Sequence, residues 1–239
     1  MPPAPALAGQ LNAEECRILT ATISDEWKKP QVVLEIGTWL GGGSTLHFLK
    51  ALEANGEGHL WGVEADRSIY ERMIENIRVA VPEALHRFTP LFGFSQQVIP
   101  RWLAEQGAAA TVDVAFLDGG DNPLEQITEF QLLADRIPVR GHLLAHDAKL
   151  RKGKWLLPYL RQLDNWKVEL HDVSVEGLLS AEKLAPSPSA QSRDAAAATL
   201  RKLKREPAEM LGRILPSWLC ALLLKMMPTA LRKSVSQGR

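Results

Sequence analysis

The sequence predicts an α/β fold: a doubly wound, mostly parallel sheet of seven strands, with the last strand antiparallel and helices on both faces. Short apolar runs bounded by turn residues alternate with stretches whose apolar residues recur at helical intervals. The last two apolar runs are joined too tightly for a helical crossover, so they are expected to form an antiparallel hairpin. The chain has 239 residues, of which 46% are hydrophobic, enough for one large domain or for one domain with an appendage.

The expected strands and helices alternate along most of the chain. Strands are expected over residues 32–36, 59–64, 88–92, 112–117, 141–145, 166–173 and 176–183. Helices are expected over residues 12–27, 44–54, 68–81, 95–106, 122–137 and 154–164. Asn12 is a suitable N-cap for the first helix, because Glu15 follows three residues later and can complete a capping box.

The pattern divides the chain into an N-terminal helical segment (1–30), the α/β domain (31–183), a Pro- and Ser-rich linker (184–193) and a basic, amphipathic helical tail (194–239). From Arg193 onward the chain carries a net charge of +7, whereas residues 1–192 carry −7. The apolar run over 214–227 is too short to span a bilayer, but its large side chains can share one helical face. We expect the tail to dock on an acidic body, its own or that of a second copy in a homodimer. Peripheral contact with an anionic membrane surface is the alternative.

The composition also bears on the cellular compartment. Cys16 and Cys220 are far apart and suggest neither a disulfide framework nor a metal-binding pair, which favours a reducing environment. The first residues lack the basic start and apolar core of a secretory signal. No uninterrupted apolar run reaches the roughly 20 residues of a membrane-spanning helix. A cytoplasmic protein is therefore expected.

A glycine-rich turn, LEIGTWLGGGST, follows the first expected strand and leads into a helix. Glycine tolerates positive φ and lets a ligand approach the main chain, while a helix N-terminus offers free N–H groups to an anionic group. The spacing from Gly37 to Gly41 differs from the G-x-G-x-x-G of nucleotide-binding dehydrogenases, which argues against a nicotinamide-dependent oxidoreductase. A plain strand-to-helix turn without a ligand stays open as an alternative.

This stretch resembles motif I of the class I S-adenosylmethionine-dependent methyltransferases, E/D-x-G-x-x-x-G, with Glu35, Gly37 and Gly41 at its fixed positions. One more glycine than in these relatives precedes Ser44 and Thr45. The resemblance implies a Rossmann-like methyltransferase fold and S-adenosylmethionine as the cofactor. It assigns the methionyl part of the cofactor to this turn.

Two later stretches add cofactor residues through the same resemblance. The second strand ends in GVEAD, where Glu64 matches the carboxylate that accepts hydrogen bonds from both ribose hydroxyls. The segment GFSQQ is similar to the G-x-S-Q of catechol O-methyltransferases, which places Ser95 and Gln96 beside the adenine. Without a cofactor, Glu64 would be a solvated acid at a strand end and Ser95 a helix N-cap.

Polar residues also end the fourth and fifth strands, in VDVAFLDGGD and GHLLAHDAK. Ligands of open α/β sheets bind outside the carboxyl ends of the strands, so Asp118, His146 and Asp147 are expected to converge near the methyl donor. Matching positions in the catechol-type enzymes coordinate a divalent cation, which implies Mg²⁺ or another divalent metal at these three residues. His-Asp stands where the relatives have Asp-Asn, a change that favours Mn²⁺, Zn²⁺ or no metal.

The catalytic base of the catechol enzymes has no counterpart at the expected place. Those enzymes have a Lys three residues after the fourth-strand Asp, and here Asp121 occupies that position. His146 is the better candidate base, because an ordinary histidine pKa near 6.5 suits proton transfer near neutrality. The candidate catalytic residues are therefore His146, Asp118 and Asp121, with Asp118 also close to the cofactor.

The resemblance implies O-methylation of a small-molecule hydroxyl, on a phenolic, sugar or natural-product acceptor, and no nucleic-acid partner. A protein of the same fold that binds the cofactor without methyl transfer is the main alternative, since the catechol-type Lys is missing.

Overall fold

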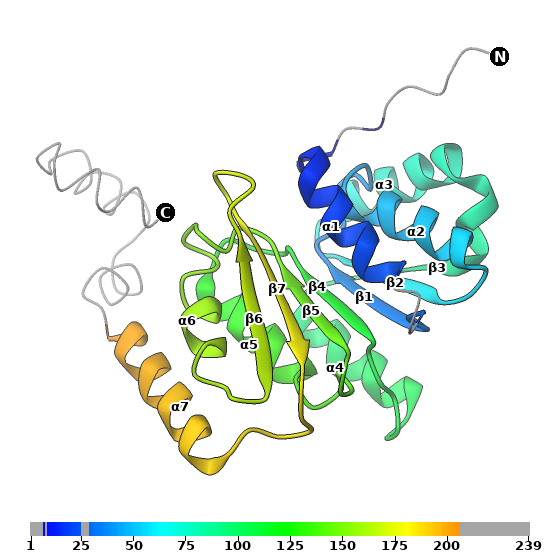
Figure 1. Cartoon of the computed structure of the whole chain (residues 1–239). Helices are drawn as coiled ribbons and strands as arrows, with labels where there is room; N and C mark the ends of the chain where they lie inside the picture. The colour runs from blue at the N-terminus through cyan, green and yellow to red at the C-terminus, as the bar shows by residue number, and fades with distance from the viewer. Residues whose placement is uncertain (1–6, 8, 25–28, 206–239) are drawn as a thin grey trace, which may run out of the picture.

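The computed structural model describes residues 7, 9–24 and 29–205. Its centre is a seven-stranded sheet in the order β3-β2-β1-β4-β5-β7-β6, which confirms the predicted fold class (Figure 1). The strands are β1 (Val32–Ile36), β2 (His59–Glu64), β3 (Phe88–Phe92), β4 (Val114–Leu117), β5 (His142–Ala145), β6 (Trp166–His171) and β7 (Leu178–Lys183). β7 runs antiparallel to both of its neighbours, and the other paired strands are parallel. The chain reverses its direction of winding between β1 and β4, where α/β sheets bind their ligands.

Helices cover both faces of the sheet. They are α1 (Ala13–Ile23), α2 (Ser44–Asn55), α3 (Arg67–Ala80), the 3₁₀ helix η1 (Pro82–Arg87), α4 (Ser95–Gln106), α5 (Pro123–Leu133), α6 (Leu156–Leu160) and α7 (Ala190–Lys204). The expected cap of α1 is present: the Asn12 side chain accepts from the N–H groups of Glu14 and Glu15, and the Glu15 carboxylate accepts from the N–H of Asn12. α4 spans the expected residues, but Phe94 takes the N-cap position, so Ser95 is the first helical residue and not the cap.

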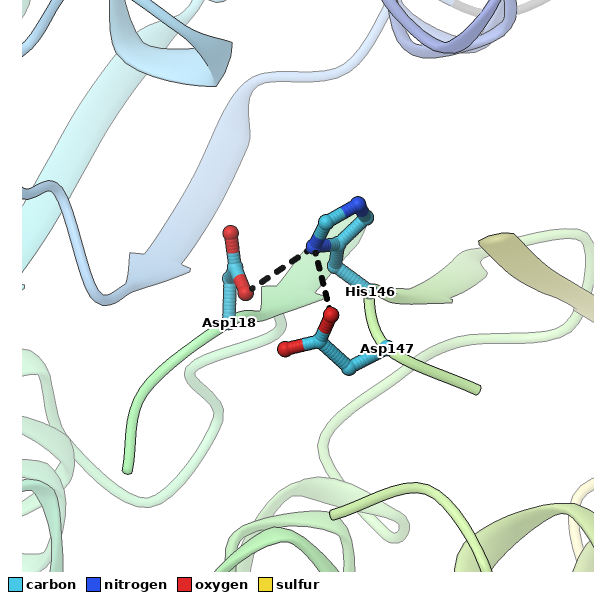
Figure 2. Close-up of side chains that lie close together, drawn as sticks. All are labelled: Asp118, His146 and Asp147. Carbon is cyan, nitrogen blue, oxygen red and sulfur yellow. Dashed lines mark ion pairs between the residues drawn. The ribbon is translucent and has the colours of Figure 1, made fainter. Parts of the chain in front are cut away.

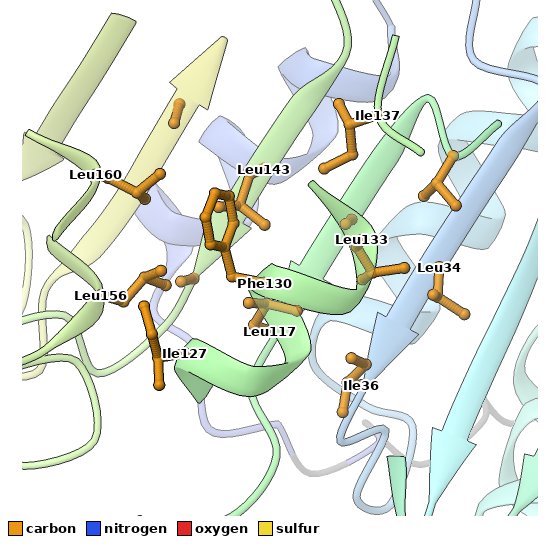
Figure 3. Packing of buried hydrophobic residues seen from close by; sticks show 14 of the residues in the cluster. Leu34, Ile36, Leu117, Ile127, Phe130, Leu133, Ile137, Leu143, Leu156 and Leu160 are labelled. Atoms are coloured by element: carbon orange, nitrogen blue, oxygen red, sulfur yellow. The ribbon is translucent and has the colours of Figure 1, made fainter. Parts of the chain in front are cut away.

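Both faces of the central strands are buried, which explains their continuous apolar sequences. Leu34 and Ile36 pack into one cluster with residues of α4, α5 and α6 (Figure 3). Val33, from the same strand, joins a second cluster with residues of α1, α2 and α3. Side chains alternate across a strand, so Glu35 lies on the same face as Val33 and points toward the layer that contains α2.

The basic tail begins as a docked helix. α7 starts at Ala190, inside the segment expected to be a linker, because the Ser189 hydroxyl accepts from the Ser192 N–H and caps it. Ala196 and Leu200 are buried in the cluster that also contains Leu156 and Leu160 of α6. The apolar run expected over 214–227, and with it the proposed dimer and membrane contacts, lies outside the described residues. No helix in the described part of the chain is long and apolar enough to cross a membrane.

Candidate active site

The glycine turn after β1 is pressed against the end of β4. Gly37 has φ +89°, and a Cβ at this position would lie 2.5 Å from the Asp118 carbonyl oxygen. Gly41 and Trp39 also have positive φ, +82° and +46°. Only glycine fits at Gly37, since both the positive φ and the close contact exclude a side chain. The hydroxyl oxygen of Thr38 in the same turn is buried and has no hydrogen-bond partner in the described part of the chain.

Glu35 lies beneath this turn and holds the start of α2. Its side chain is fully buried and accepts a hydrogen bond from the Ser44 hydroxyl. Burial raises the pKa of Glu35 to about 8, although the hydroxyls of Ser44 and Thr45 act in the opposite direction. The structure therefore places Glu35, Ser44 and Thr45 in the support of the turn, next to the position proposed for the cofactor.

Glu64 ends β2 and faces the same turn. One of its carboxylate oxygens accepts from the Trp39 N–H at 3.0 Å, and the other from the Asp66 N–H at 2.9 Å. Each carboxylate oxygen can accept a further hydrogen bond, so these contacts orient the carboxylate without exhausting it. The side chain expected to hold the ribose is thus fixed at the rim of the turn.

The GFSQQ segment enters α4 with its serine turned inward. The Ser95 hydroxyl donates to Glu129 of α5 at 2.6 Å, and both residues are buried. Burial raises the pKa of Glu129, and the hydrogen bond from Ser95 offsets part of that rise. Gln96 is partly exposed on the first turn of the helix. Of the two residues expected beside the adenine, Ser95 therefore already has a partner within the protein.

Asp118, His146 and Asp147 converge at the carboxyl ends of β4 and β5, as the sequence predicts (Figure 2). Nδ1 of His146 lies 3.4 Å from a carboxylate oxygen of Asp118 and 3.4 Å from one of Asp147. Asp147 has φ +58°, a left-handed conformation that turns the chain sharply after the strand. Asp121 does not join this group: its side chain is exposed on the loop before α5.

The chain has a match over residues 34–148 to a family model described as "Methyltransferase domain". A search of curated proteins found no match. Solved structures with the same fold include a Klebsiella pneumoniae protein provisionally named an O-methyltransferase, with a TM-score of 0.58, 20% identity and coverage of 75% of this chain and 84% of that one. Another is the O-methyltransferase from Bacillus cereus in complex with SAH, with a TM-score of 0.56, 16% identity and coverage of 74% and 84%.

Residues 34–148 match a methyltransferase domain, and they contain most of β1 and all of β2, β3, β4 and β5 of the seven-stranded sheet. The methyltransferase match begins within β1 and ends at Ala148, so it includes the glycine turn, Glu64 and the polar residues after β4 and β5. It leaves out two residues that complete the polar cluster.

Lys152 is the first of these residues. Its ammonium lies 2.8 Å from carboxylate oxygens of both Asp118 and Asp147, and the residue is only 5% exposed. Burial alone would lower the pKa of Lys152, but the charges and hydrogen bonds of the two aspartates outweigh it and raise the pKa. Nothing in the sequence distinguishes this residue, because the segment KLRKGK contains three lysines without any periodicity.

Glu15 is the second. Its carboxylate reaches from α1 to Nε2 of His146 at 3.3 Å, and its side chain is 2% exposed. Burial alone would lower the pKa of His146, but the hydrogen bond and charge of Asp118, with the charges of Asp147 and Glu15, raise it. Sequence reasoning identified Glu15 only as a capping residue, and it has both roles. Carboxylates therefore lie on both sides of the His146 ring, Asp118 and Asp147 at Nδ1 and Glu15 at Nε2.

Proposed function

We propose that this protein transfers the methyl group of S-adenosylmethionine to a hydroxyl oxygen of a small-molecule acceptor. The observation that carries the proposal is the position of the Asp118, His146, Asp147 and Lys152 cluster at the end of β4, directly against the glycine turn. A donor held at the turn would present its methyl group to an acceptor held at the cluster. The names of the structural neighbours, several of them O-methyltransferases, support this choice of acceptor atom.

The turn and its surroundings fit the cofactor. The glycines of the turn, Gly37 and Gly41 with positive φ and Gly42 and Gly43 before α2, suit the methionyl part, because they let a ligand approach the main chain at a helix N-terminus. The Glu64 carboxylate suits a ribose diol, because two acceptor oxygens meet two donors. The assignment of Ser95 and Gln96 to the adenine stays part of the proposal. Because the Ser95 hydroxyl donates to Glu129, adenine contact through Ser95 would use its backbone or the lone pairs of its hydroxyl oxygen.

For this reaction the protein must position the methyl donor and the acceptor, and it must remove one proton from the acceptor hydroxyl. When bound, the cofactor supplies a methyl group activated by a sulfonium. The acceptor oxygen forms a bond to the methyl carbon as the carbon–sulfur bond breaks, and the hydroxyl proton passes to a base. His146 is our proposed base, with Asp118 and Asp147 holding its ring. It must be neutral to accept a proton, so its raised pKa predicts that turnover increases with pH above the ordinary range of histidine.

The group Asp118, His146 and Asp147 has a donor set that can hold a divalent cation, with ligand atoms within 4.8 Å of one another. The position of Lys152 does not fit that role. Its ammonium already occupies the space between the two aspartates, so a metal ion would sit beside a buried positive charge. No metal step is therefore included in this proposal.

The test is formation of S-adenosylhomocysteine from S-adenosylmethionine with a panel of phenols and sugars, measured by mass spectrometry. The wild-type protein is expected to turn over at least one acceptor, and Asp118→Asn to lose turnover while its affinity for S-adenosylhomocysteine stays within a few-fold. An exposed carboxylate, Glu105→Gln, is the matched control and should keep both properties. Binding without turnover on any acceptor would favour the cofactor-binding alternative. An ultraviolet difference spectrum on adding NADH would favour the oxidoreductase.

A further inference from the structure

We propose that Lys152 supplies the cation of the acceptor site, in place of a divalent metal ion. The inference rests on the proposed function, because it concerns the same cluster. The Lys152 ammonium lies 2.8 Å from a carboxylate oxygen of Asp118 and 2.8 Å from one of Asp147. These aspartates are two of the three residues that could hold a metal ion. The contacts come from one buried side chain that enters the site from the loop after β5.

The loop after β5 is built to return Lys152 to the strand end. The N–H groups of Leu150 and Gly153 both donate to the Asp147 carbonyl oxygen, at 3.0 and 3.2 Å, so the loop closes on itself. A Cβ at Gly153 would lie 2.4 Å from the Cα of Ala148, which makes glycine necessary for this closure. Lys152, the residue just before Gly153, therefore lies beside Asp147.

A second lysine in the same loop shows that the placement is selective. The Lys149 ammonium turns away from the cluster and binds the hairpin between β6 and β7, at the Asp172 carboxylate and the Ser174 carbonyl. The backbone of the loop is also tied to this hairpin, through the N–H of Lys149 and the carbonyl of Glu176. Lys149 thus anchors the loop, and Lys152 is left to occupy the site.

Charge and space argue that the ammonium and a metal ion exclude each other. Mg²⁺ needs oxygen ligands at about 2.0–2.1 Å, and the Asp118 oxygen that faces His146 is the one that the ammonium already contacts. A buried ammonium is stable only when its charge is matched, which Asp118 and Asp147 achieve. Removing the ammonium would leave two carboxylates close together in a poorly hydrated site. Such a site should then recruit a cation from solution.

The ammonium can also do what a metal would do for the acceptor. A lysine ammonium has three N–H donors, and its contacts with Asp118 and Asp147 account for two of them. A third donor is left for the acceptor oxygen, whose negative charge grows as its proton leaves. Lys152 would then orient that oxygen and stabilise its charge, while His146 takes the proton.

The experiment is a Mn²⁺ titration followed by electron paramagnetic resonance, with wild type, Lys152→Met and the exposed-lysine control Lys167→Met. We expect wild type and Lys167→Met to bind Mn²⁺ no tighter than about 1 mM, and Lys152→Met to gain one site at least tenfold tighter, about 1.4 kcal/mol. Adding Asp118→Asn to Lys152→Met should remove the gain. Turnover by the wild type should survive excess EDTA.

The proposal is overturned if the wild type binds one Mn²⁺ tightly and Asp118→Asn abolishes that binding. It is also overturned if a folded Lys152→Met binds no more Mn²⁺ than the wild type. Lys152→Gln replaces Lys152→Met if Lys152→Met does not unfold cooperatively in a melting experiment. The Mn²⁺ titration of the wild type tests the proposal even if neither variant folds. The Mn²⁺ measurement uses neither cofactor nor acceptor, so a protein inactive on every acceptor would count against the proposed function alone.

Discussion

The carboxylate of Glu15 lies 3.3 Å from Nε2 of His146, although 131 residues separate them in the chain. The same carboxylate accepts from the Asn12 N–H and so completes the capping box of α1. The Glu15 side chain therefore fixes the start of α1 and also contacts the ring of His146, the residue proposed as base.

We predict that Glu15→Gln separates these two roles. Glutamine also completes a capping box, so α1 should keep its cap and the melting temperature should change little. Loss of the charge removes one of the interactions that raise the pKa of His146, so that pKa should fall. The rise of turnover with pH, and the His146 ring signal in an NMR titration, should both move to lower pH. A pKa of His146 identical in the two proteins would contradict a charge interaction with Glu15.

The second prediction concerns the ribose contact. Glu64→Ala should weaken binding of S-adenosylhomocysteine at least tenfold, a loss of about 1.4 kcal/mol, because two hydrogen bonds to a charged group disappear. Isothermal titration calorimetry measures the change, with the exposed Glu71→Ala on α3 as the control. Glu64 also holds the N–H groups of Trp39 and Asp66, so a melting curve must accompany the titration. Equal affinity for wild type and Glu64→Ala would remove Glu64 from the cofactor site.

The third prediction follows from the buried carboxyl of Glu35, whose pKa is raised to about 8. The folded state therefore holds a proton that the unfolded chain releases above its ordinary pKa of 4.5. That contribution to the free energy of unfolding is fully present below the unfolded pKa and is lost as pH rises through about 8. Glu35→Gln mimics the protonated form, so the free energy of unfolding of the variant, measured with urea, should depend less on pH than that of the wild type. At alkaline pH the variant should gain stability relative to the wild type, by on the order of a few kcal/mol. If the free energies of unfolding of the two proteins changed in parallel from pH 5 to about pH 9, the raised pKa of Glu35 would be refuted.

The fourth prediction concerns the tail. Because α7 is packed on the domain through Ala196 and Leu200, the informative truncation removes residues 206–239 and keeps this helix. We expect the truncated protein to fold and its mass in solution to fall to half, as for a dimer that forms through the removed segment. Analytical ultracentrifugation gives the mass, and co-sedimentation with anionic liposomes tests the alternative. Lost pelleting at unchanged mass would favour the membrane contact instead.

The sequence by itself determined the fold class, the order of the elements and the convergence of Asp118, His146 and Asp147. These features rest on local signals: short, nearly continuous apolar runs in strands such as β1, the capping box at Asn12, the positive φ that only glycine tolerates at Gly37, and the rule that parallel strands end at one edge. Each signal is contained in a few neighbouring residues. That is why each could be recognised before any packing was known.

Only the tertiary structure decided which partners these polar residues have. Ser95 meets Glu129 rather than capping its helix, Glu15 meets His146, and Lys152 meets two aspartates. The first two contacts join residues far apart in the chain, and the third depends on a loop that closes around one glycine. A buried charge must find a counter-charge wherever the packing brings one, and the sequence carries no periodic signal for that choice.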